Sequence, residues 1–126
     1  MCAKLNRKGD NLLTINTEYK RGIMFVRLKG ELTKDTVNKL DKKVINKIEN
    51  LKTYNLVFNV TNLKIIDYKG INKLLYSYEI VKKNKGKILL CGNNLNIKNR
   101  LKKSRILNYI FEISDEIYAS KYLKKG

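Results

Sequence analysis

The chain has 126 residues, of which 43% are hydrophobic, so it is long and apolar enough for one domain with a buried core. Lys and Arg number 28 against 11 Asp and Glu, which gives a net charge of +17, and there is no His. The lack of His removes the commonest general base and metal ligand, and no apolar run reaches the roughly 20 residues that span a bilayer.

The start of the chain and its two cysteines are typical of a protein that is not exported. Residues 1–10 are polar and lack the apolar region of a signal peptide, so we expect a flexible tail ahead of one domain over residues 11–126. Cys2 lies in this tail, and Cys91 ends the apolar run ILLC and should be buried. Two such cysteines make neither a disulfide framework nor a metal site, so we expect a cytoplasmic protein without metal or cofactor.

The first part of the chain predicts a β-hairpin followed by a helix. Residues 12–19 and 22–30 alternate in the manner of strands, with a short connection between them that contains glycine. Residues 33–51 change to helical spacing, with Thr33 as the expected N-cap. The apolar stripe of this helix consists of Val37, Leu40, Val44, Ile48 and Leu51.

The middle of the chain predicts a βαβ unit. Residues 55–60 and 88–91 are short apolar strands, and residues 70–83 between them have the spacing of an amphipathic helix. Strands joined by such a crossover should be parallel. The glycine of NKGK, residues 84–87, is expected to end the helix.

The last part predicts two further helices around one more strand. A short basic helix follows Gly92, with Asn93 or Asn94 as its cap; residues 106–113 become extended at their end; and Ser114 is expected to cap a final helix. The whole pattern predicts an α/β fold: a mixed sheet of four to five strands that begins with a hairpin, and about four helices packed mainly on one face.

Few residues offer enzymatic chemistry, so we expect no enzyme. No Ser or Cys lies in a nucleophile elbow, and no glycine-rich phosphate loop occurs. What remains is a pair of turns, residues 29–36 and 65–71, which follow two strands that should be neighbours in the sheet. Asp67 is expected to cap the next helix, whereas Lys69 places a cation in a first helical turn, where the dipole disfavours it.

Four stretches in register resemble the STAS domain of bacterial anti-sigma factor antagonists, the regulators of sporulation and general stress. They are GEL at 30–32, Thr36, NLVFNVTNLKIIDYKGI at 55–71 and KGKILLCG at 85–92, and the resemblance extends over roughly residues 12–123. It implies a STAS-like single domain that binds proteins and catalyses nothing. The partner it implies is an anti-sigma factor that is also a serine kinase of the histidine-kinase-like ATPase fold.

The family pattern after the central strand is an apolar pair, Asp, Ser, Ser or Thr, Gly and Leu, and the second hydroxyl residue accepts the phosphate. Here Asp67, Gly70 and Ile71 match, but Tyr68 replaces the first Ser and Lys69 replaces the acceptor. The resemblance therefore implies partner-switching control of transcription without phosphorylation at the usual position. A phosphate would otherwise add about −1.5 to −2 charge at the contact.

The expected partner-binding residues come from the two turns: Glu31, Thr33, Lys34, Asp67, Tyr68, Lys69 and Gly70. Two interpretations of Lys69 stay open, namely a fixed positive charge that a partner uses or drift at an exposed position after the switch was lost. Gly70 permits a close backbone approach either within the fold or to a partner. Modification of Tyr68, Thr33 or Thr36 also stays open, and we expect a monomer or weak dimer.

The positive charge supports two alternatives. One is a stand-alone STAS module that binds a nucleotide or another small anion or that scaffolds a larger complex. The other is a basic protein that binds nucleic acid or an anionic membrane surface. An AT-rich bacterial genome gives the same excess of Lys, and the lysines are scattered while Arg is scarce, so we expect no specific nucleic-acid recognition.

Overall fold

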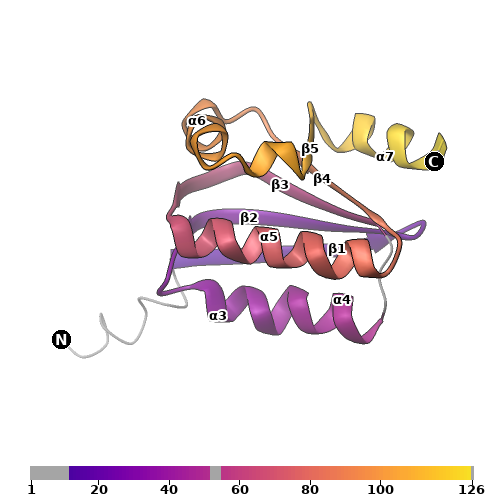
Figure 1. Cartoon of the computed structure of the whole chain (residues 1–126), viewed down its shortest axis with the longest axis horizontal. Coiled ribbons are helices and arrows are strands. Elements are labelled where there is room, and N and C mark those ends of the chain that lie inside the picture. The colour runs from indigo at the N-terminus through magenta and orange to yellow at the C-terminus, as the bar shows by residue number, and fades with distance from the viewer. Residues whose placement is uncertain (1–11, 52–54, 126) are drawn as a thin grey trace.

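A five-stranded mixed sheet organises the computed structural model, which describes residues 12–51 and 55–125 (Figure 1). The strands lie in chain order: β1 (Leu13–Lys20), β2 (Ile23–Leu32), β3 (Asn55–Ile66), β4 (Lys87–Cys91) and β5 (Phe111–Ile113). Strand β1 is antiparallel to β2, and every later neighbour is parallel. The predicted hairpin, βαβ unit and mixed sheet are thus confirmed, whereas the predicted tail at residues 1–10 lies outside the described residues.

Helices cover both faces of the sheet. They are the continuous run α3 (Val37–Leu40), η1 (Asp41–Ile45) and α4 (Asn46–Asn50), followed by α5 (Tyr68–Lys83), α6 (Leu95–Ser104), the short η2 (Ile106–Asn108) and α7 (Glu116–Lys125). The α3–α4 run and α5 lie side by side along one face, and α7 lies beyond the sheet on the other (Figure 1). The expectation that helices pack mainly on one face holds, with α7 as the exception.

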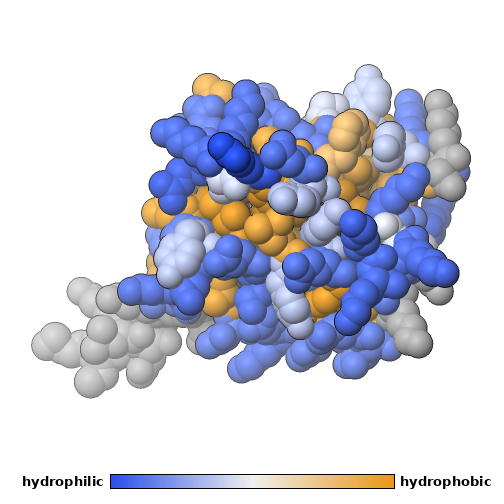
Figure 2. Space-filling view, in the orientation of Figure 1, coloured by the Kyte–Doolittle hydropathy of each residue, from blue (hydrophilic) through white to orange (hydrophobic). Residues whose placement is uncertain are grey.

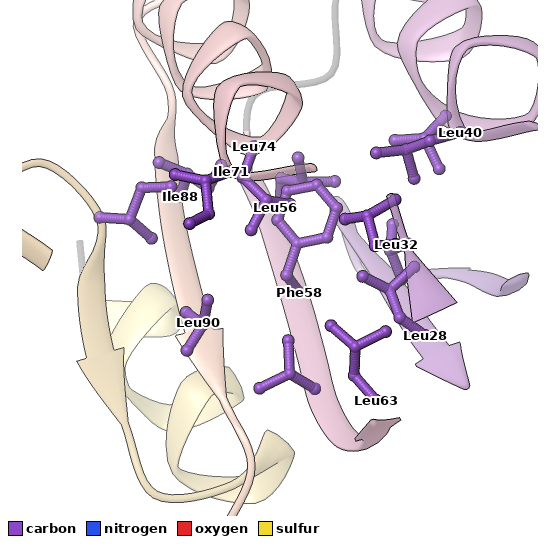
Figure 3. Packing of buried hydrophobic residues seen from close by; sticks show 14 of the residues in the cluster. Leu28, Leu32, Leu40, Leu56, Phe58, Leu63, Ile71, Leu74, Ile88 and Leu90 are labelled. Atoms are coloured by element: carbon purple, nitrogen blue, oxygen red, sulfur yellow. The ribbon is translucent and has the colours of Figure 1, made fainter. Parts of the chain in front are cut away.

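The larger core lies between the sheet and the helices α3–α4, α5 and α6. Figure 3 shows Leu56 and Phe58 of β3 close to Leu74 of α5, and all three side chains are fully buried. A smaller cluster on the opposite face joins Phe25, Val57 and Leu89 to α7. Side chains of β2 alternate between the two faces of the sheet, and both faces are covered.

Cys91 belongs to the smaller cluster and is completely buried. Burial in apolar surroundings raises the pKa of its thiol to about 12, and nearby Glu116 and Asp115 add to the effect. A thiol that stays protonated at neutral pH is a poor nucleophile. The expectation that Cys91 is a buried core residue is confirmed.

A polar cluster fixes the first turn of α7 to the sheet. The guanidinium of Arg27 donates two hydrogen bonds to Glu116, each 2.8 Å long, and a third of 2.8 Å to Glu18. Asn59 donates to the same Glu116 carboxylate at 2.8 Å. The hydrogen bonds from Arg27 lower the pKa of Glu116 most, and the bond from Asn59 adds to this effect. Together they outweigh the partial burial of the carboxylate, which raises its pKa. The arrangement is the bidentate one in which Arg binds carboxylates best.

Two predicted N-caps are wrong by one and three positions. The first helix begins at Val37 rather than after Thr33, because the Thr36 hydroxyl donates to the carbonyl oxygen of Glu31 at 2.8 Å and holds residues 33–36 in a turn. Asp115, not Ser114, caps α7 by accepting from the Tyr118 N–H at 2.9 Å. By contrast, Asn94 caps α6, as one of the two predicted alternatives.

Three further expectations need correction. The left-handed residue after α5 is Lys85, with φ of 63°, rather than Gly86, whose N–H bonds the Val81 carbonyl oxygen at 2.9 Å. The apolar stripe of the first helix ends at Ile48, because Leu51 follows the helix and is 66% exposed. Strand β3 continues to Ile66, six residues beyond the predicted end, because β2 pairs with it along this length.

Candidate functional site

The two predicted turns lie side by side at the carboxyl ends of β2 and β3. The parallel register pairs Glu31 with Ile65 and Leu32 with Ile66, so both strands end together. The Asp67 N–H continues this ladder by donating to the Leu32 carbonyl oxygen at 3.2 Å. The expectation that the turns are neighbours is therefore confirmed, and they lie at the edge where loops of parallel sheets commonly form sites.

Asp67 joins the two turns through its side chain. Its Oδ1 accepts from the Gly70 N–H at 2.9 Å, which caps α5 as predicted. Its Oδ2 accepts from the Lys34 N–H at 2.9 Å, across the gap between the turns. Because both carboxylate oxygens accept backbone N–H groups, Asp67 fixes the conformation of each turn and their relative position.

Gly70 is required by the fold itself. The residue is buried, and a Cβ at this position would overlap the Leu32 carbonyl oxygen and lie 3.0 Å from the Ile66 Cγ1 atom. Of the two explanations that the sequence left open, the structure contains the close approach within the fold. The helix start can pack against the end of β2 only because residue 70 lacks a side chain.

Gly30 of the GEL stretch has a similar role at the start of the other turn. It takes a φ of 104°, and a Cβ there would overlap the Leu12 carbonyl oxygen. The strand register also shifts between Gly30 and Glu31, so β2 bends at this point. A positive φ at a bulge is a conformation that glycine adopts without strain.

Thr36 and Thr33 stabilise the first turn from inside. Thr36 is 2% exposed, and its hydroxyl accepts from the Thr33 N–H at 2.9 Å while donating to Glu31. Thr33 is half-buried, and its hydroxyl accepts from the Asp35 N–H at 3.3 Å. Modification of Thr36 would require the turn to open, because its hydroxyl is both buried and hydrogen-bonded.

Tyr68, Lys69 and Lys34 form the outer surface of the site. Tyr68 is 66% exposed, and both lysines are exposed. The Lys69 Nζ atom lies 5.6 Å from the centre of the Tyr68 ring, within the range of a cation–π contact. Of the seven predicted residues, Lys34 and Gly70 both donate to Asp67, and Glu31 accepts from Thr36 through its carbonyl oxygen. Thr33 accepts from Asp35 within its own turn, and Tyr68 and Lys69 face outward.

Arg100 supports the site and was not predicted. Its guanidinium Nη2 atom extends from α6 and donates to the Ile66 carbonyl oxygen at 3.0 Å, one residue before Asp67. Asn94 acts similarly, donating to the carbonyl oxygens of Val60 at 2.8 Å and Leu63 at 2.6 Å. The sequence indicates a basic helix at this point, but only its packing against β3 reveals these bonds.

Neither a cluster of metal ligands nor a membrane-spanning helix is found in the described part of the chain. Within residues 12–51 and 55–125, no group of three or more Cys, Asp or Glu side chains is arranged to hold a metal ion. No helix in those ranges is both long and apolar enough to span a bilayer. The site offers backbone turns joined by Asp67, two exposed lysines and one exposed tyrosine.

Solved structures resemble this fold over most of its length. An anti-sigma factor antagonist from Mycobacterium paratuberculosis has a TM-score of 0.79 and 16% identity, covering 89% of this chain and 94% of its own. The unphosphorylated anti-sigma factor antagonist SpoIIAA has a TM-score of 0.70 and 16% identity, covering 90% and 99%. At this identity the likeness establishes the fold alone, and the predicted STAS-like fold is thereby confirmed.

The sequence comparisons agree with the structural ones. A curated relative, the anti-sigma F factor antagonist of Paenibacillus polymyxa, is 25% identical over 107 residues, which are 85% of this chain and 92% of the relative. The family model of the STAS domain matches residues 14–121. Since that match takes in nearly all of the described sheet and helices, this chain belongs to the STAS domain family.

Proposed function

We propose that this protein is a non-enzymatic regulator that binds a partner protein through the two turns joined by Asp67, in the manner of an anti-sigma factor antagonist. The double acceptance by Asp67 is the observation that carries the proposal. It holds the turns together as one surface from which Tyr68 and Lys69 extend into solvent. A surface ordered before binding loses little conformational entropy when a partner docks.

The proposed partner is an anti-sigma factor of the histidine-kinase-like ATPase fold, in the cytoplasm. Support comes from family membership and from the curated relative, whose name includes anti-sigma F factor. Lys34 and Lys69 make the outer surface positive, so the partner should present acidic side chains at the contact. Charges at such a rim mainly raise the association rate and its dependence on salt.

Lys69 determines how this regulator would differ from its phosphorylated relatives. An amine cannot form the phosphate ester that a serine forms, and the exposed Tyr68 hydroxyl lies one position early on a longer side chain. The proposed complex is therefore constitutive: the partner kinase has no acceptor at the contact and cannot release the regulator by phosphorylating it. Control would then depend on the amounts of the two proteins.

The test uses the ATPase captured from the source lysate and then purified. After incubation with ATP, intact mass spectrometry should show no added phosphoryl group on the natural chain and one on a Lys69→Ser variant. Lys69→Glu should weaken binding of the ATPase. Lys43→Glu, which makes the same charge change at an exposed position on η1, should not.

Failure to recover an ATPase of this fold, or equal binding by the two Glu variants, would contradict the proposed interface. Phosphorylation of the natural chain at residues 67–70 would contradict the constitutive complex while leaving the interface intact.

A further inference from the structure

A groove lies far from the two turns, at the amino-terminal end of β4. It has a volume of about 320 Å³, and its lining comes from the end of α5, the start of β4, the segment after η2, and α7. Lys82 on its rim and Lys69 in the proposed interface lie near opposite ends of α5, about 20 Å apart along the helix axis. The groove therefore belongs to a different surface from the one described above.

One side of this groove is aromatic. Phe111 and Tyr122 stack with ring centres 5.4 Å apart and planes inclined by 21°, and Tyr109 contacts Tyr78 at 5.7 Å. The three rings of the outer wall are well exposed: 57% for Tyr109, 54% for Phe111 and 42% for Tyr122. Figure 2 shows apolar surface in the band between α5 and the η2 segment, bordered by hydrophilic side chains. Exposed stacked rings are apolar area that the core does not use.

The other side is basic. Lys82 and Lys87 line the groove. They begin and end the stretch KKNKGK, residues 82–87, which carries four exposed lysines and no acid. The Lys82 Nζ atom lies 5.6 Å from the Tyr78 ring and the Lys87 Nζ atom 5.6 Å from the Tyr122 ring. No Asp or Glu is among the described residues that line the groove. The aromatic side and the basic side of the groove together favour a ligand that is both planar and anionic.

The helix dipole explains the positions of only two of these four lysines. Lys82 and Lys83 lie in the last turn of α5, where the dipole favours cations. Lys85 and Lys87 lie beyond the helix, and Lys85 takes a left-handed φ of 63° at a position where glycine is usual. A lysine in that conformation costs stability that Gly would not.

We propose that this groove binds single-stranded nucleic acid without strong sequence preference, with a base stacked against the wall formed by Tyr109, Phe111 and Tyr122 and phosphates along residues 82–87. A basic wall facing an aromatic wall is the arrangement by which proteins bind single strands. The groove has room for about one nucleotide, and the strand leaves it across exposed lysines. No Arg is among the described residues of the lining, which agrees with stacking rather than readout of base edges.

The assay is fluorescence anisotropy with a labelled oligonucleotide of about 12 uridines, a length within the range of known single-strand sites. Four neutralised phosphates give a slope of about −2.8 in log K against log salt, so affinity should fall about 50-fold between about 50 mM and about 200 mM salt. Lys82→Gln with Lys87→Gln should halve the slope, to a fall of about sevenfold. Lys85→Gly should weaken binding while melting no lower than the natural chain.

The aromatic wall is tested separately. Phe111→Ala with Tyr109→Ala should weaken binding about tenfold or more at each salt concentration while leaving the salt slope unchanged. The matched controls are Lys42→Gln with Lys43→Gln, exposed lysines on η1, and Tyr19→Ala, an exposed ring on β1. These controls should bind like the natural chain.

Three results would overturn the assignment. The first is no binding at the lower salt concentration. The second is an equal loss in the control variants, which would mean that net charge alone binds the strand. The third is competition by uridine monophosphate as strong as that by the oligonucleotide, which would mean a site for a single nucleotide.

Discussion

Replacing Asp67 by Ala should loosen both turns of the proposed interface together. The change removes the acceptor of the Gly70 N–H that caps α5 and the acceptor of the Lys34 N–H in the other turn. Asp67→Asn should have about half the effect, because an amide offers one carbonyl oxygen and turns its NH2 group toward the second N–H.

The magnitude follows from the two bonds. Loss of a helix cap costs about 1 kcal/mol. Loss of the bond from Lys34 adds only about 1 kcal/mol, because the Lys34 N–H is exposed and water can take the place of Asp67 as its acceptor. With an unfolding entropy of about 2.1 cal/mol/K per residue, about 2 kcal/mol lowers the melting temperature of a 126-residue chain by about 8 °C.

Thermal melts monitored by circular dichroism measure this shift, and hydrogen exchange at the Lys34 amide reports the bond between the turns. Asp115→Ala is the matched control, because Asp115 caps α7 through the Tyr118 N–H and joins no second turn. It should cost about 1 kcal/mol and leave exchange at Lys34 unchanged. Equal melting temperatures for Asp67→Ala and Asp115→Ala, with no faster exchange at Lys34, would refute the role assigned to Asp67.

Two further changes test the packing around the site and the attachment of α7. Gly70→Ala should lower the free energy of unfolding by about 2 kcal/mol in urea titrations, because overlap with the Leu32 carbonyl oxygen outweighs the better helix propensity of Ala; a more stable variant would contradict this. Glu116→Gln should cost about 1–2 kcal/mol at pH 7. Because Arg27 lowers the pKa of Glu116 in the folded state, the native bond stabilises fully above the unfolded pKa and is lost as pH falls through the folded one, so the two proteins should converge in acid.

The sequence predicts elements well where the signal is local. Alternation located β1 and β2, and helical spacing located α5. The Asp67 cap was predictable because an acid stands directly before an amphipathic helix, and the neighbouring turns followed from the parallel order of the strands.

Other features depend on contacts that leave no local pattern. Ser114 and Asp115 are equally good capping residues, and only the backbone path decides between them. Thr33 does not cap the first helix, because the Thr36 hydroxyl holds residues 33–36 in a turn. The bonds of Asp67 to Lys34, and of Arg27 to Glu116, join residues 33 and 89 positions apart, a separation that spacing rules do not address.

The strand order of the sheet has a consequence for how the chain folds. Each strand pairs with its neighbour in sequence, so the ladders close over short distances: Ile23 meets Asn55, Asn55 meets Lys87, and Leu89 meets Phe111. Parallel strands usually fold slowly because distant segments must meet, but here the entropy of loop closure is kept small at every step. The sheet can therefore grow from the hairpin outward in chain order, with each new strand adding to the edge formed by the strand before it.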